Sequence, residues 1–135
     1  MSPKEIVNEM MRLDAFSQWL GISIDVIEKG RCQLSCTVRA EMLNGHQIAH
    51  GGITYSLSDS ALAFASNAHG KKAVSIETSI SHVYSVKEND RLRVLCEESY
   101  RGKTVGIYHV SIFNQNEVLV SRFKGTVHIS DNDWE

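Results

Sequence analysis

The hydrophobic pattern changes its period along the chain, and this predicts both helices and strands. Ile6, Met10 and Leu13 recur at helical spacing. They follow Ser2-Pro3-Lys4-Glu5, where a capping serine, a proline at the first helical position and a glutamate three residues after the cap are typical of a helix start. A second short helical turn is expected over 14–21, with Asp14 as its cap and a glycine as its stop.

Alternation of apolar and polar residues then predicts antiparallel strands. A hairpin is expected over 22–38, with its turn at Lys29-Gly30. After residue 72 the strand pattern returns, and short turns of hairpin length separate the runs. The later strands are predicted at 73–84, 91–100, 104–113 and 118–128.

One long helical pattern separates the hairpin from the later strands. It covers residues 53–70, is apolar on nearly all of its faces, and follows a segment rich in turn formers at 40–52. An apolar helix between a hairpin and a run of strands predicts an α+β fold in which the sheet wraps around the helix.

Composition narrows the possible functions. A chain of 135 residues has room for one domain, here 1–135, and a net charge of −2 offers no positive field for nucleic acid. No run approaches the roughly 18 to 20 apolar residues of a membrane helix, so no membrane partner is expected. Lys4, Glu5 and Glu9 stand where a signal peptide would be apolar, which favours the cytoplasm. The odd number of cysteines, three, argues against a disulfide framework, and Cys32 and Cys36 are expected to be small buried residues.

Asp59 is the first candidate for chemistry. It is the only Asp, Glu, Lys or Arg in the span 42–70, in the middle of the apolar helix. A carboxylate buried there without a partner would cost several kcal/mol. Asp59 therefore reaches solvent on a narrow face, accepts hydrogen bonds from Ser56, Ser58 or Ser60, or does chemistry.

His50-Gly51-Gly52, at the start of the helix, is the second candidate. The first N–H groups of a helix have no internal partner and carry the positive end of its dipole, so they can hold an oxyanion. A tight turn is the alternative interpretation. Eight residues of helix separate Gly51 from Asp59 by about 12 Å. Reacting atoms approach to about 3 to 3.5 Å, so a site that used both groups would need two subunits.

These residues resemble a known family. Asn44-Gly45-His46, His50-Gly51-Gly52 and Ser56-Leu57-Ser58-Asp59, with 102–108 and Phe123-Lys124-Gly125 further on, are similar to hotdog-fold acyl-CoA thioesterases of the phenylacetic-acid-degradation (PaaI) type. The resemblance implies the hotdog fold, an acyl-CoA substrate with a small, aromatic acyl group of the phenylacetyl type, and no cofactor. It also implies a homo-oligomer built from dimers of shared sites, either a dimer or a tetramer.

The resemblance also implies roles for individual residues. The Gly51 N–H would polarise the thioester carbonyl, and Asp59 of the neighbouring subunit would be the nucleophile or the general base. Asn44 would orient the water or the aspartate, His50 would help to bind the thioester, and Ser75 would help to place the water. Each of the last three also has a plain interpretation: Asn44 as a turn residue, His50 as part of the loop and Ser75 as an ordinary strand residue.

Binding of the coenzyme A phosphates departs from the family pattern. Members of the family commonly carry Arg-Pro-Gly after the strand that follows the helix, where this chain has Tyr84-Ser85-Val86. The missing positive charge must then come from other residues. The predicted substrate-binding residues are Gly52, Ser60, Lys103, Arg101 and Lys72.

Other functions fit parts of the pattern. His46 and His50 have the spacing of a helical metal pair, but the glycines around them indicate a loop, and no metal site is predicted. A non-catalytic acyl-CoA-binding module or regulator on the same fold is the main alternative, although it would gain nothing from Asp59. A hydratase or dehydratase would need a histidine placed as a base beside an acid on the helix, and the interior of this helix has no histidine.

Overall fold

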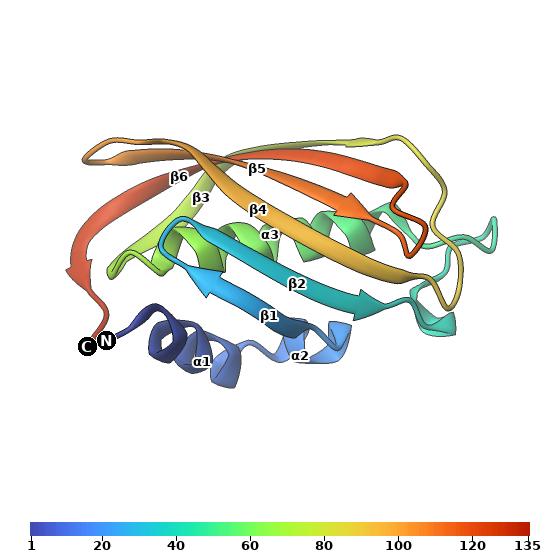
Figure 1. Cartoon of the computed structure of the whole chain (residues 1–135), viewed down its shortest axis with the longest axis horizontal. Coiled ribbons are helices and arrows are strands. Elements are labelled where there is room, and N and C mark those ends of the chain that lie inside the picture. The colour runs from blue at the N-terminus through green and yellow to red at the C-terminus, as the bar shows by residue number, and fades with distance from the viewer.

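A single curved sheet covers one long helix (Figure 1). The computed structural model describes all 135 residues. Its six strands lie in the order β1-β2-β4-β5-β6-β3, and every neighbouring pair is antiparallel. The strands are β1 Ser23–Glu28, β2 Arg31–Thr37, β3 Lys71–His82, β4 Arg91–Arg101, β5 Val105–Phe113 and β6 Leu119–Asp133. The predicted arrangement, a sheet wrapped around a helix, is confirmed.

Helix α3, Gly51–Asn67, lies along the concave face of this sheet (Figure 1). It contacts all six strands, and helices α1 and α2 contact it as well. Leu57, Phe64 and Ala65 are fully buried. Because the helix is enclosed in this way, apolar residues occupy most of its faces and it forms the centre of the core. None of the helices is long and apolar enough to cross a membrane.

Two short helices precede the sheet. Helix α1, Pro3–Leu13, begins with the predicted capping box: Ser2 Oγ accepts the Glu5 N–H, and the Glu5 carboxylate accepts the Ser2 N–H. Helix α2, Ala15–Leu20, is capped by Asp14 and ends at Gly21, whose φ of +76° suits glycine. Both helices are confirmed as predicted.

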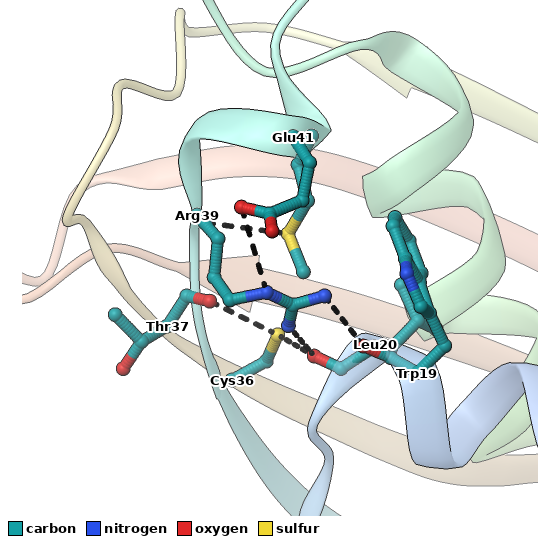
Figure 2. Close-up of polar contacts among 7 residues, drawn as sticks. Trp19, Leu20, Cys36, Thr37, Arg39 and Glu41 are labelled. Carbon is teal, nitrogen blue, oxygen red and sulfur yellow. Dashed lines mark hydrogen bonds and ion pairs between the residues drawn. The ribbon is translucent and has the colours of Figure 1, made fainter.

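Arg39 fixes the end of α2 to the loop that precedes α3, as Figure 2 shows. Its guanidinium donates hydrogen bonds to the carbonyl oxygens of Trp19 and Leu20, at 2.7 and 3.2 Å. It also lies 4.9 Å from the centre of the Trp19 ring and 3.8 Å from Glu41. The single 3-10 turn Ala40–Met42 follows it, an element that the sequence pattern did not predict. These contacts hold the end of α2 against the segment that precedes α3.

Several element boundaries differ from the prediction. Helix α3 begins at Gly51, two residues earlier than predicted, and ends at Asn67. Strand β6 continues to Asp133, five residues beyond its predicted end. The reason is pairing: β6 lies between β5 and β3, and its polar last residues pair with β3 as far as Lys71. Such long-range pairing leaves no mark in local hydrophobic alternation.

Asn67 connects the end of α3 to the edge of the sheet. This residue is 2% exposed. Its amide donates to the carbonyl oxygens of Ala63 and Ala73, and its oxygen accepts the Ala73 N–H and the Trp134 indole N–H. One amide therefore joins α3, β3 and the C-terminal segment.

We expect Asn67→Ala to lower the free energy of unfolding by about 2–3 kcal/mol, because it leaves buried backbone groups of Ala73 without their partner. Urea unfolding followed by circular dichroism measures this change. Asn116→Ala, at an exposed side chain without hydrogen bonds, is the control and should change stability by less than about 0.5 kcal/mol. Equal stability of the two variants would contradict the role of Asn67.

Candidate active site

The start of helix α3 presents a free backbone donor. His50 is the N-cap, and its Nδ1 accepts the Gly52 N–H at 2.9 Å. The Gly51 N–H, one residue earlier, makes no hydrogen bond within the chain. Because it also lies at the positive end of the helix dipole, this N–H can bind a carbonyl oxygen that gains negative charge.

A cavity of about 320 Å³ lies beside this donor. Its lining includes Gly51, Asn44 and Tyr84. The Asn44 side-chain oxygen accepts the His46 and Ile48 N–H groups, at 2.9 and 3.4 Å, and so closes the turn before the helix. Asn44 is therefore a turn residue in structural terms, and its side chain also faces the cavity that contains Gly51.

His82 is a cavity residue that the sequence did not reveal. Its ring Nε2 lies 3.2 Å from the position that a Cβ on Gly51 would occupy, and its Nδ1 lies 3.2 Å from Thr54 Oγ1. A side chain at position 51 would crowd this ring, which explains the glycine. His82 ends β3, far from Gly51 in sequence, and only the packing of β3 against α3 brings the two residues together.

Asp59 has no partner for its carboxylate. It is half-buried near the middle of α3 and makes neither a hydrogen bond nor an ion pair within the chain. Ser60 Oγ bonds Ser17 instead, and Ser58 Oγ is buried without any partner. The alternative in which a neighbouring serine bonds Asp59 is therefore wrong. Burial, and then the negative charge of Asp14, raises the pKa of Asp59. A carboxylate of raised pKa is a stronger base.

A second cavity, of about 400 Å³, contains Asp59. Ser75 and Lys72 of β3 line it too, as do Met10 of α1 and Trp134 near the C-terminus. The Lys72 ammonium lies 4.9 Å from the centre of the Trp134 ring. Three of the predicted site residues, namely Asp59, Ser75 and Lys72, therefore share one cavity.

The remaining predicted residues lie elsewhere. Arg101 and Lys103 are exposed at the β4–β5 turn and line neither cavity. Gly52 donates to His50, and Ser60 faces α2. Gly51 and Asp59 line different cavities, as the helix rise of about 12 Å over eight residues requires.

The histidine pair is part of a loop. His46 is exposed, and a ring nitrogen of His50 already accepts the Gly52 N–H. The structure contains no group of three or more His, Cys, Asp or Glu side chains that could hold a metal ion. Cys32, Cys36 and Cys96 are free and buried, which confirms the prediction for the first two.

Comparison with known proteins identifies the family. Residues 46–121 match the family model of the thioesterase superfamily. The acyl-coenzyme A thioesterase PaaI of Escherichia coli K12 is 37% identical over 119 residues, which cover 88% of this chain and 85% of that protein. The chain belongs to the thioesterase superfamily. The solved structure of Escherichia coli PaaI aligns with this superfamily member at a TM-score of 0.94 and 34% identity, and covers 97% of this chain and 95% of that one.

Two further solved structures resemble this thioesterase-superfamily chain. PaaI of Thermus thermophilus, in a mutant form, is 31% identical at a TM-score of 0.82, over 85% of this chain and 98% of that one. A Streptococcus mutans protein bound to acetyl-CoA is 26% identical at a TM-score of 0.81, over 84% and 91% of the two chains. The predicted hotdog fold and the predicted enzyme class, thioester hydrolase, are thereby confirmed at the level of the family.

We expect Asp59→Asn to raise the free energy of unfolding at pH 7. The folded-state pKa of Asp59 is raised, so its ionised form destabilises the folded protein at neutral pH. This gain should disappear as the pH falls below the pKa of the unfolded aspartate, where both states bind the proton. Urea unfolding at pH 7 and pH 3 measures it, and Asp25→Asn, at an exposed carboxylate, is the control. A less stable Asp59→Asn protein at pH 7 would show that Asp59 has a partner after all.

Proposed function

We propose that the protein hydrolyses acyl-CoA thioesters to the free acid and coenzyme A, with small aromatic acyl groups of the phenylacetyl type as its preferred substrates. Membership of the thioesterase superfamily supports the reaction, and the named activity of Escherichia coli PaaI supports the substrate class. The observation that carries the proposal is the unpartnered Asp59 carboxylate at a cavity, in a chain that also holds a free Gly51 N–H.

The proposed enzyme is a dimer with shared sites, and two dimers form a tetramer. Strand β3 is an edge strand whose outer side is unpaired, and its side chains Val74 and Ile76 are 66% and 60% exposed. An exposed apolar edge of this kind favours pairing with another strand. Pairing with a second copy would cover it. A two-fold axis there would also place the two α3 helices near each other, Gly51 of one beside Asp59 of the other.

The reaction follows from these two groups. The thioester carbonyl oxygen accepts the Gly51 N–H, and negative charge on that oxygen is stabilised as the carbonyl carbon is attacked. In one route, the carboxylate of the partner's Asp59 attacks and displaces the coenzyme A thiolate. The resulting anhydride is then hydrolysed by water. In the other route, that carboxylate takes a proton from water, the water oxygen attacks, and the thiolate leaves and is protonated.

The other site residues position the Gly51 donor, the attacking water and the substrate. His50 occupies the Gly52 N–H and so leaves the Gly51 N–H as the free donor. Asn44 and Ser75 each face one half of the site, where their polar side chains orient the attacking water. We assign the phosphate groups of coenzyme A to Arg101, Lys103 and Lys72, with Gly52 and Ser60 lining the path of the substrate.

We expect Asp59→Asn to lower kcat at least about 100-fold, the usual contribution of a positioned acid or base. Thiol release from acetyl-, hexanoyl-, benzoyl- and phenylacetyl-CoA measures activity and acyl preference together. Asp25→Asn is the matched control and should behave like the native protein. Equal rates for Asp59→Asn and native protein would exclude the role of Asp59. Binding of acyl-CoA without turnover by the native protein would indicate the non-catalytic binding module instead.

A mixture of two inactive variants tests the shared site. Gly51→Pro removes the free N–H at the first helical position, where the backbone tolerates proline, and its ring also crowds His82. Both effects disable the Gly51 half of the site. In a hybrid dimer with Asp59→Asn, one of the two sites keeps both functional groups. After subunit exchange, the mixture should therefore recover roughly a quarter of the native activity. Exchange proven by mass spectrometry, with no recovered activity, would place each site within one subunit.

A further inference from the structure

Asp14 connects the two N-terminal helices. It ends α1 and caps α2: its Oδ1 accepts the Ser17 N–H at 2.9 Å and its Oδ2 accepts the Ser17 hydroxyl at 2.6 Å. The side chain of Asp14 is half-buried, and Ser17 is 1% exposed. The Asp14 carboxylate is therefore held in place by two hydrogen bonds to a buried neighbour.

A chain of hydroxyl groups runs from Asp14 to the residue beside Asp59. Ser17 Oγ lies 2.8 Å from Ser60 Oγ. A hydroxyl has a single proton, and Ser17 gives its proton to Asp14, so Ser60 must donate to Ser17. The Ser60 proton then points away from Asp59 and toward the N-terminal helices. This explains why the nearest hydroxyl in sequence does not stabilise the Asp59 carboxylate.

A second contact also brings Asp14 close to Asp59. Met10 of α1, four residues before Asp14, lines the same cavity as Asp59. Met10 lies in the last turn of α1 and Asp14 is the C-cap of that helix, so this end of α1 lies near Asp59 of α3. The contact through Met10 and the contact through Ser17 and Ser60 are independent. Together they place the Asp14 charge near that of Asp59.

Few other charges face Asp59. Lys72 of β3 is the only other titratable residue that lines its cavity. The Lys72 ammonium lies over the Trp134 ring and makes no ion pair with Asp59. The remaining residues that line the cavity, from α1, α3, β3, β6 and the C-terminal segment, are apolar or carry uncharged polar groups. No other carboxylate lines this cavity, and the Asp14 charge is the cause that, after burial, raises the pKa of Asp59.

We propose that Asp14 is a positioning residue for the reaction: its charge, held by Ser17 and Ser60, keeps the Asp59 carboxylate strongly basic. The proposal rests on the proposed function, in which Asp59 is the base or the nucleophile. A nearby negative charge disfavours ionisation of a carboxyl group, and a more basic carboxylate takes a proton or attacks a carbonyl faster. The pKa of Asp59 is raised, first by burial and then by the Asp14 charge, which is the direction that the proposal requires.

Asp14 also has a structural role as the cap of α2, and the test must separate the two roles. Asparagine and serine cap helices about as well as aspartate but carry no charge. Asp14→Asn and Asp14→Ser therefore keep the cap and remove the charge. Asp25→Asn removes one exposed negative charge elsewhere and is the matched control. The midpoint of thermal unfolding at pH 7 shows which of the two Asp14 variants folds like the native protein, and that variant is used.

The experiment measures kcat/KM against pH by thiol release, with the best acyl-CoA of the panel. Native activity should fall at acidic pH as Asp59 is protonated. In Asp14→Asn this fall should move to lower pH, and the rate at the plateau should drop several-fold. The ratio of variant to native activity should therefore be higher at acidic than at neutral pH. A purely structural role would lower activity without moving the fall.

An acid fall at the same pH in native protein and both Asp14 variants would overturn the proposal. A shift of equal size in Asp25→Asn would overturn it too, since any surface charge would then suffice. Carbon-13 NMR titration of the Asp59 carboxyl group gives a readout independent of turnover. If Asp59 proves dispensable for hydrolysis, the catalytic role of Asp59 in the proposed function fails. The NMR shift between native protein and Asp14→Asn then still reports whether Asp14 controls the basicity of Asp59.

Discussion

Burial of helix α3 under the curved sheet is the constraint on which the rest of the structure depends. The helix contacts all six strands and both N-terminal helices, so nearly every face of it must be apolar. This accounts for the long uncharged stretch of sequence around it. It also makes Asp59 an exception, because a carboxylate on such a helix loses solvation and gains nothing in return from a partner. The rigid helix fixes where this exception lies relative to the free Gly51 N–H.

The rigid helix keeps the two candidate functional groups apart. The N-terminus of α3 offers a donor at the positive end of the helix dipole, and the middle of α3 offers a carboxylate about 12 Å away. Each group faces its own cavity. His82, at the end of β3, lines the Gly51 cavity, and Ser75, near the start of β3, lines the Asp59 cavity. In the function that we propose, one chain therefore holds two complementary halves of a site. The edge position of β3 is what makes it possible to bring halves from two chains together.

Local patterns predicted the local features well. The start of α1 follows from Ser2, Pro3 and Glu5, and Asp59 is evident from the absence of charge around it. Features that depend on distant segments were not predictable. His82 reaches Gly51 only through the packing of β3. The Ser60 hydroxyl does not bond Asp59, because it donates its hydrogen bond to Ser17 of another helix. The late end of β6 has the same origin, since pairing with β3 supports residues that alternation does not mark.

Unpartnered polar groups lower stability at the candidate site, and hydrogen bonds near it raise stability. The Asp59 carboxylate and the buried Ser58 hydroxyl both lack partners, and each lowers the stability of the folded chain. Close by, Asn67 makes four hydrogen bonds that hold the end of α3, and Arg39 ties α2 to the segment before its start. Polar contacts therefore fix the end of the helix, where Asn67 also lines the Asp59 cavity, and the segment before its start. A carboxylate without donors stays reactive only if its surroundings do not rearrange to satisfy it, and hydrogen bonds that fix the neighbouring elements oppose such a rearrangement.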